Sequence, residues 1–147
     1  MTTDMPLTAT EIRDLRAFAG TMIPASERYG VPGADDEVIF ADIGKSLDRD
    51  REDIGLALKR LAALAGGAFA DLSAERRLII ANELRVEGGP PLAALTRAIL
   101  LCYYRDDRVM RSLGQEPRPP FPKGHVVEQG DWSLLDPVKK RAPFYRR

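Results

Sequence analysis

The chain has 147 residues, of which 44% are hydrophobic and 30% charged, and its 22 basic and 22 acidic residues give a formal net charge of zero. This composition is that of an ordinary globular protein with one domain large enough to bury a core. The balanced charge argues against nucleic-acid binding, and no run reaches the roughly 18 apolar residues of a membrane span. The single cysteine, Cys102, excludes an intrachain disulfide.

The first half of the chain predicts three helices separated by turn-rich segments. Thr8 followed by Glu11 is the pattern of a capping box, and helical spacing then continues as far as Pro24. The stretch PASERYGVPGADD has the Pro, Gly, Ser and Asp content of an ordered loop. A second helix is predicted from about Asp35 and a third from about Asp50, which Gly66 and Gly67 end. The apolar residues that carry these three patterns are Ile12, Leu15, Ala19 and Met22, then Val38, Ile39, Ile43 and Leu47, then Ile54, Leu58, Leu61 and Leu64.

The second half predicts two further helices and a short sixth. Ser73 is a good N-cap for a helix that closes at Gly88 and Gly89, with Leu78, Ile79 and Leu84 expected to face inward. Prolines 90 and 91 start the next helix, and a short one is predicted around residues 107–113, ending at Gly114. The helix after the prolines includes Leu92, Leu95, Ile99, Leu100 and Tyr103. No alternating run long enough for a strand is present, so the sequence predicts an all-α fold: a small bundle of about five helices over residues 1–114.

Residues 115–147 predict a long, extended, Pro-rich C-terminal arm. They hold six of the 11 prolines and four of the ten aromatic residues, and the last nine residues carry five positive charges and no acid. Prolines favour an extended path, whereas the aromatic side chains favour burial. We therefore expect the arm to pack along a partner or along its own helical body.

Catalytic residues are scarce in this sequence. Cys102 follows two leucines, which predicts a buried small side chain and not a reactive thiolate. His125 is the sole histidine, so any histidine-dependent catalysis would have to use a residue of the arm. The acids at 35–37 and 48–53 stand where helices begin, and they lack the spacing of a calcium loop. We find no dinucleotide, Walker or haem-attachment motif, so the sequence predicts no catalytic, cofactor-binding or metal site in this chain.

Segments near both ends resemble the gluconate 2-dehydrogenase subunit 3 family. The opening LRAFAGTMIPAS, followed by YGVPGADD and VIFADI, is similar to the start of those proteins. The stretch YYRDDRVMRSLGQEPRPPFPKGH is similar to their end, where a helix with paired aromatic residues leads into a Pro- and Gly-containing segment.

This resemblance implies a small helical accessory subunit without a cofactor of its own. Family members bind a large FAD-dependent dehydrogenase or oxidase of the glucose-methanol-choline (GMC) type, which acts on a sugar, sugar acid or other alcohol. The large subunit carries the FAD and the catalytic bases, and the small subunit stabilises or matures it. In some complexes a cytochrome c subunit accepts the electrons. The twin-arginine signal of exported members is absent here, which favours a cytoplasmic complex, or a periplasmic one if the partner carries the signal.

Two hypotheses about function follow. The first is this accessory subunit; the second is a stand-alone helical adaptor whose PxxP segment, Pro119–Pro122, docks into a groove-type domain. Both place partner binding on aromatic and proline residues, because interface energy concentrates in aromatic anchors and prolines preset an extended path. The predicted partner-binding residues are Tyr104, Pro119, Pro120, Phe121, Pro122, His125, Trp132, Phe144 and Tyr145.

Overall fold

The fold was obtained as a computed structural model that describes residues 7–118 and 128–142. The chain divides into two compact units, Met1–Pro117 and Arg118–Arg147. We call the first unit the body and describe each unit by itself. Sequence reasoning had placed this boundary at Gly114.

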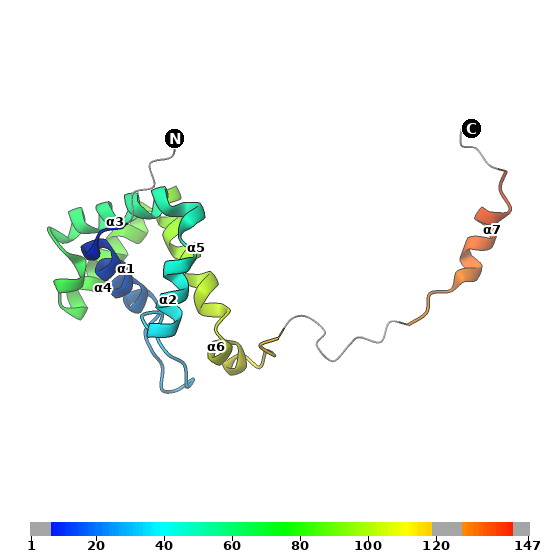
Figure 1. The fold of residues 1–147 in the computed structure, drawn as a ribbon, viewed down its shortest axis with the longest axis horizontal. Coiled ribbons are helices and arrows are strands. Elements are labelled where there is room, and N and C mark those ends of the chain that lie inside the picture. Colours follow the sequence, from blue (N-terminus) through cyan, green and yellow to red (C-terminus); the bar gives the residue numbers. More distant parts are fainter. Residues whose placement is uncertain (1–6, 119–127, 143–147) are drawn as a thin grey trace. The chain divides into compact units, whose positions relative to one another are not determined.

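The described part of the body is all-helical, which confirms the predicted all-α fold (Figure 1). Its helices are α1 (Ala9–Met22), α2 (Glu37–Lys45), α3 (Arg51–Ala65), α4 (Ala74–Glu87), α5 (Pro90–Tyr104) and α6 (Asp107–Ser112). Short 3-10 turns at Asp48–Asp50 and Phe69–Asp71 precede α3 and α4. The second unit contains a 3-10 turn, Trp132–Leu135, which continues into α7, Asp136–Lys139.

Local sequence signals explain where these helices begin and end. The Thr8 side chain accepts a hydrogen bond from the Glu11 amide, and the Glu11 carboxylate accepts one from the Thr8 amide, which completes the predicted capping box. The side chains of Asp36 and Ser73 cap α2 and α4 by accepting hydrogen bonds from backbone amides of the first turn. Gly66 ends α3 in the left-handed conformation (φ 71°) that glycine adopts most readily.

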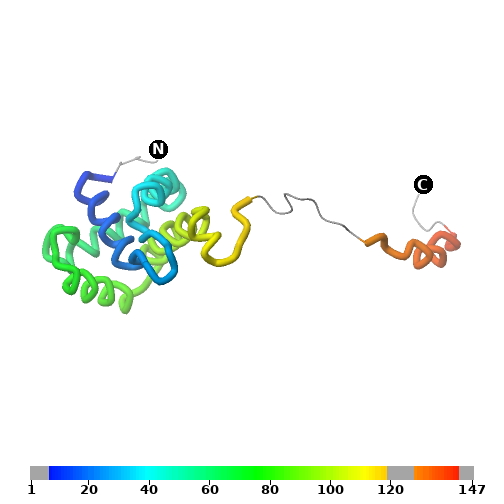
Figure 2. Tube along the Cα trace, turned by 90° about the horizontal axis from the view of Figure 1, so that it is seen from below, coloured from blue at the N-terminus to red at the C-terminus, as the bar shows by residue number. Residues whose placement is uncertain are grey.

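The core of the body lies where α3 and α5 pack against each other, with α1, α2 and α4 around them (Figure 2). Fully buried large side chains come from all six helices of the body and from the turn before α4: Leu15, Ile39, Ile43, Ile54, Leu58, Leu61, Phe69, Ile80, Leu95, Ile99 and Val109. Phe18 packs against Phe69 at a ring-centroid distance of 6.1 Å, so α1 is joined to that turn by an aromatic pair.

One buried carboxylate reinforces the same contact. Asp14 of α1 is 2% exposed, and its Oδ1 accepts a hydrogen bond of 2.8 Å from the backbone amide of Ala70. Because a buried polar group is costly without a partner, this bond fixes the turn against α1.

The segment between α1 and α2 is an ordered loop with a tight hairpin at its end. Ser26 and Val31 form an antiparallel bridge with two backbone hydrogen bonds of 3.0 and 3.1 Å. At the base, Ala34 N donates to Ile23 O, and Arg16 Nε donates to Asp35 O. The loop is therefore held at its base as well as in its hairpin, as its turn-rich composition predicted.

Two predictions about the helices were wrong. Leu78 and Ile79 of α4 are 55% and 48% exposed, while Ile80 and Leu84 are buried. Three consecutive apolar residues, 78–80, fit more than one helical face, and the packing on α3 and α1 selects Ile80. Residues 132–139 were expected to be extended, but they form the short helical segment of the second unit, with Pro137 in the first turn of α7, where proline is tolerated.

Candidate functional site

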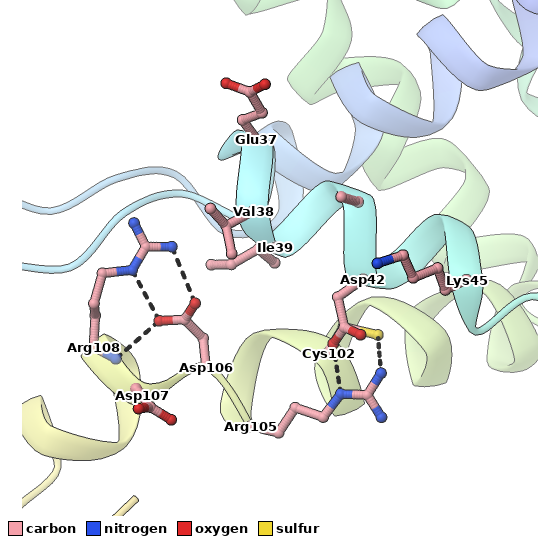
Figure 3. Close-up of a pocket in the computed structure, with 11 residues that line it drawn as sticks. Glu37, Val38, Ile39, Asp42, Lys45, Cys102, Arg105, Asp106, Asp107 and Arg108 are labelled. Atoms are coloured by element: carbon pink, nitrogen blue, oxygen red, sulfur yellow. Dashed lines mark hydrogen bonds and ion pairs between the residues drawn. The ribbon is translucent and has the colours of Figure 1, made fainter.

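A shallow groove of about 910 Å³ lies between α2 and the corner where α5 meets α6 (Figure 3). We call it the α2–α6 groove. Its apolar lining comes from Val38, Ile39 and Ala41 of α2 and from Cys102 of α5. Its charged lining is Glu37, Asp42, Lys45, Arg105, Asp106, Asp107 and Arg108. The groove therefore has an apolar patch between charged groups.

Arg105 links the two walls of the groove. Its Nε donates to Asp42 Oδ2 at 2.5 Å, and its Nη2 donates to Ser46 Oγ at 2.7 Å. The guanidinium thereby holds the pKa of the Asp42 carboxyl below its ordinary value, chiefly through this hydrogen bond. Asp42 is ionised at neutral pH, and Arg105 is neutralised by it.

Arg108 forms a second link at the other end of the groove. Its Nη2 donates to Asp36 Oδ1 at 2.7 Å and to Asp106 Oδ2 at 3.0 Å, and its Nη1 reaches Asp36 Oδ2 at 3.2 Å. Hydrogen bonding to this guanidinium lowers the pKa of both carboxyls. Both arginines are thus paired with carboxylates, so these charges of the groove are held in place.

Cys102 forms part of the floor and is 1% exposed. Burial raises the pKa of its thiol, so the protonated form prevails at neutral pH. The prediction of a buried small side chain is therefore confirmed. The Arg105 guanidinium lies 3.5 Å from the Cys102 sulfur, and its positive charge lowers the pKa of the thiol. Burial raises this pKa by more, so it stays above the ordinary value.

An exposed apolar strip runs along the outer face of α5, beside the groove. Its members are Leu100, Leu101 and Tyr104, which are 38%, 62% and 52% exposed. Leu101 precedes Arg105 by four residues, so the two are neighbours on the helix surface and the strip borders the groove. We call these three residues the α5 strip.

The two adjacent tyrosines of α5 have different environments. Tyr103 is 5% exposed, and its hydroxyl donates to Pro32 O at 3.3 Å, which ties α5 to the loop. The Tyr104 ring packs edge-on against it at a centroid distance of 5.3 Å and projects into solvent. Tyr104, the one predicted site residue within the body, is therefore presented on a rigid support.

Of the other predicted site residues, the structure describes only Trp132, which is 66% exposed on the second unit. The remaining predicted residues, Pro119, Pro120, Phe121, Pro122, His125, Phe144 and Tyr145, lie outside the described residues. Sequence reasoning missed Val38, Leu101, Arg105 and Arg108. The stretch YYRDDR, in which the two arginines flank two aspartates, was the available signal for these arginines.

Over residues 7–118 and 128–142, no group of three or more His, Cys, Asp or Glu side chains is arranged to hold a metal ion. In the same ranges no helix has the length and apolar character that a bilayer crossing requires. The α2–α6 groove and the α5 strip together form a rigid surface on which apolar side chains lie beside charged ones. That combination is typical of a protein-binding surface.

Comparison with known proteins found no matching family model, no matching curated protein and no matching solved structure. The family resemblance consequently depends on the residues quoted above. The structure adds one observation about these residues. The two resembling stretches are far apart in the sequence, yet they contact each other through Tyr103 with Pro32, Arg105 with Asp42, and Arg108 with Asp36.

Proposed function

We propose that this protein is the non-catalytic small subunit of an FAD-dependent dehydrogenase or oxidase of the GMC type that acts on a sugar, sugar acid or other alcohol. The observation that carries the proposal is the contact between the two resembling stretches, which together build the α2–α6 groove. The stretches that resemble the family lie near both ends of the chain. If they serve one function, we expect them to contribute to the same surface.

The chemistry of this surface supports binding in preference to catalysis. The arginines that line the groove are neutralised by aspartates, and the thiol in its floor is buried and protonated. A large subunit that covered the α5 strip would bury Leu101 and Tyr104, which are both more than half exposed. Aromatic and leucine side chains on a rigid helix lose little conformational freedom on binding, so their burial stabilises a complex efficiently.

In this proposal the large subunit binds FAD and performs the oxidation, and a cytochrome c subunit accepts electrons where the complex has one. The small subunit acts by mass action: because it binds the folded large subunit and not the unfolded chain, it raises the folded, flavin-loaded fraction. No residue of this chain is assigned to the flavin.

The test is co-expression with a candidate large subunit, a GMC-type flavoprotein. We expect co-expression to raise the soluble yield of the large subunit and its FAD content per polypeptide. The variant Leu101→Lys/Tyr104→Ser should lose this effect, because it places a charge and a small polar group in the α5 strip. Val86→Lys is the matched control, since Val86 is 78% exposed on α4 and is not part of the strip. A large subunit that is fully active and flavin-loaded when made alone would refute the maturation role.

A further inference from the structure

The outer face of α4 carries apolar side chains that the rest of the described body leaves exposed. Three of them are large: Leu78, Ile79 and Val86, which are 55%, 48% and 78% exposed. With 3.6 residues per turn, Ile79, Asn82 and Val86 fall within a sector of about 60° on the helix. This sector lies opposite the side on which Ile80 and Leu84 are buried. Figure 2 shows α4, in green, along one edge of the body.

A shallow, mostly apolar groove of about 580 Å³ lies beside this face, between α3 and α4. Its apolar lining is Leu64 of α3 together with Ile79 and Val86, and Glu83 and Glu87 also line it. Val86 is the most exposed of the large apolar side chains in the described residues. The face therefore has a groove and a projecting side chain next to each other, and two such faces turned by 180° are able to fill one another.

Charges on the α3 side of this face change sign along the helix. Arg76 lies near the N-terminal end of α4, whereas Glu83 and Glu87 lie nearer its C-terminal end, and the three fall within about 40° on the helix. Glu87 accepts hydrogen bonds of 2.8 and 2.5 Å from Arg60 of α3. Arg76 forms no ion pair within residues 7–118 and 128–142. An antiparallel copy of α4 presents the same flank in the reverse order, so that Arg76 of one copy meets Glu87 of the other.

Asn82 lies at the centre of the apolar face. Its Nδ2 donates to Leu78 O at 3.0 Å, and its Oδ1 accepts from Arg85 Nε at 3.3 Å. A primary amide has two N–H donors and an oxygen with two lone pairs, so one donor and one acceptor position remain. The same amide on a two-fold-related copy has the complementary positions. A single asparagine in an apolar helical seam fixes the register of the pairing helices.

We propose that α4 is a self-association surface, on which two copies of the chain pair their α4 helices antiparallel about a two-fold axis at Asn82. Leu78 and Val86 are each four residues from Asn82, so each contacts the other across the axis. Arg76 and Glu87 are six and five residues from it and form an ion pair between the copies. The proposal is independent of the proposed function, because α4 is not part of the α2–α6 groove or of the α5 strip.

A second copy satisfies this face with groups whose positions are known. It supplies an apolar side chain for the groove, a carboxylate for Arg76 and an amide for Asn82, all from the one helix. Such a self-complementary patch is what a two-fold interface requires. The contact is small, since a helix of 14 residues is about 21 Å long. We therefore expect a dissociation constant on the order of 10–100 µM.

Sedimentation equilibrium of the full chain, from about 5 µM to about 1 mM, tests the proposal. The average mass should rise with concentration from the 16.3 kDa of one chain towards twice this value. Val86→Lys should weaken dimerisation by about 100-fold or more, because the two-fold axis places two charges in the apolar contact. Val38→Lys is the matched control: Val38 is 64% exposed on α2, and dimerisation should change by less than about twofold.

A mixing experiment tests the antiparallel pairing itself. Arg76→Glu and Glu87→Lys should each weaken dimerisation by about tenfold, because each brings like charges together twice in one dimer. An equimolar mixture of the two variants should recover the wild-type constant to within about threefold, since their heterodimer restores both opposite-charge pairs. Circular dichroism checks that each variant is folded.

A wild-type chain that stays monomeric at about 1 mM overturns the proposal, and so does a dimer that Val86→Lys leaves intact. Weakening by both charge variants without recovery in the mixture also overturns it, because the face then belongs to a different protein or to another part of the same chain. The co-expression test is separate: Val86→Lys should keep the effect on the large subunit, and Leu101→Lys/Tyr104→Ser should keep the dimer. Failure of one proposal is thereby visible without failure of the other.

Discussion

Arg108 joins Asp36 and Asp106, the two aspartates that cap α2 and α6. Each carboxylate therefore has two roles: it accepts backbone amides at the start of its helix and it pairs with the same guanidinium. The arrangement fixes the loop end, the start of α2 and the α5–α6 corner relative to one another. These are the elements that form the α2–α6 groove.

Replacing Arg108 by alanine should lower the free energy of unfolding by about 1 kcal/mol. Two charge-assisted contacts are lost, but the side chain is 42% exposed, so solvent screens them in part. Urea denaturation followed by circular dichroism measures the change. Arg111→Ala is the control, because Arg111 and its partner Asp107 are each about 60% exposed, and its effect should stay below about 0.5 kcal/mol. Equal losses in the two variants would contradict a special role for Arg108.

The stabilisation by Arg108 should depend on pH in the acid range. The pKa values of Asp36 and Asp106 lie below their ordinary value of 3.8 because Arg108 donates hydrogen bonds to both carboxylates. For groups whose pKa is depressed by folding, the added stability is complete above the unfolded pKa and is lost as the pH falls through the folded pKa.

We therefore expect the stability difference between the wild type and Arg108→Ala to be constant from pH 7 to pH 5 and to shrink below about pH 4. Urea titrations at four or five pH values give this difference directly. A difference that stays the same at pH 3 would show that the ion pairs do not carry the effect of Arg108.

The sequence identified most helices because their signals are local. Thr8 with Glu11, Ser73 and Gly66 mark helix ends within a few residues of the positions that the structure gives. The face of α4 was wrong because residues 78–80 are all apolar and only the neighbouring helices select among them.

The site was less predictable because its contacts join distant residues. Arg108 and Asp36 are 72 residues apart, and Tyr103 and Pro32 are 71 apart. No periodicity reveals such pairs. Tyr104 was predicted to contact a partner. The sequence alone does not show which of the two adjacent tyrosines is buried, because this depends on the hydrogen bond from the Tyr103 hydroxyl to the Pro32 carbonyl. Residues 132–139 were missed because the whole arm was predicted to be extended from its cluster of prolines, whereas Pro137 stands in the first turn of α7, where proline is compatible with a helix.

Two glycine substitutions should have opposite effects on stability. Gly33 is buried at the base of the loop, where an added Cβ would lie 2.4 Å from Asp35 Oδ1 and 2.9 Å from the backbone nitrogen of Ala25. Gly33→Ala should therefore cost about 1–3 kcal/mol, since the loop must move. Gly55 of α3 has no atom within 4 Å of an added Cβ, so Gly55→Ala should add about 0.5–1 kcal/mol through helix propensity. Thermal melts of the two variants test both signs, and a Gly33→Ala variant as stable as the wild type would show that the loop base is not tightly packed.

Cys102 should react slowly with a thiol reagent in the native protein. It is 1% exposed, and burial raises the pKa of its thiol, so both access and thiolate content are low. We expect the rate of modification by 5,5′-dithiobis(2-nitrobenzoate) at neutral pH to rise steeply with urea, following the unfolding transition. Leu101→Cys in a Cys102→Ala background is a matched control one residue away, and at a position that is 62% exposed it should react rapidly without urea. If native Cys102 reacted as fast as this control, its thiol would be open to the α2–α6 groove, and a nucleophilic role for it would have to be considered again.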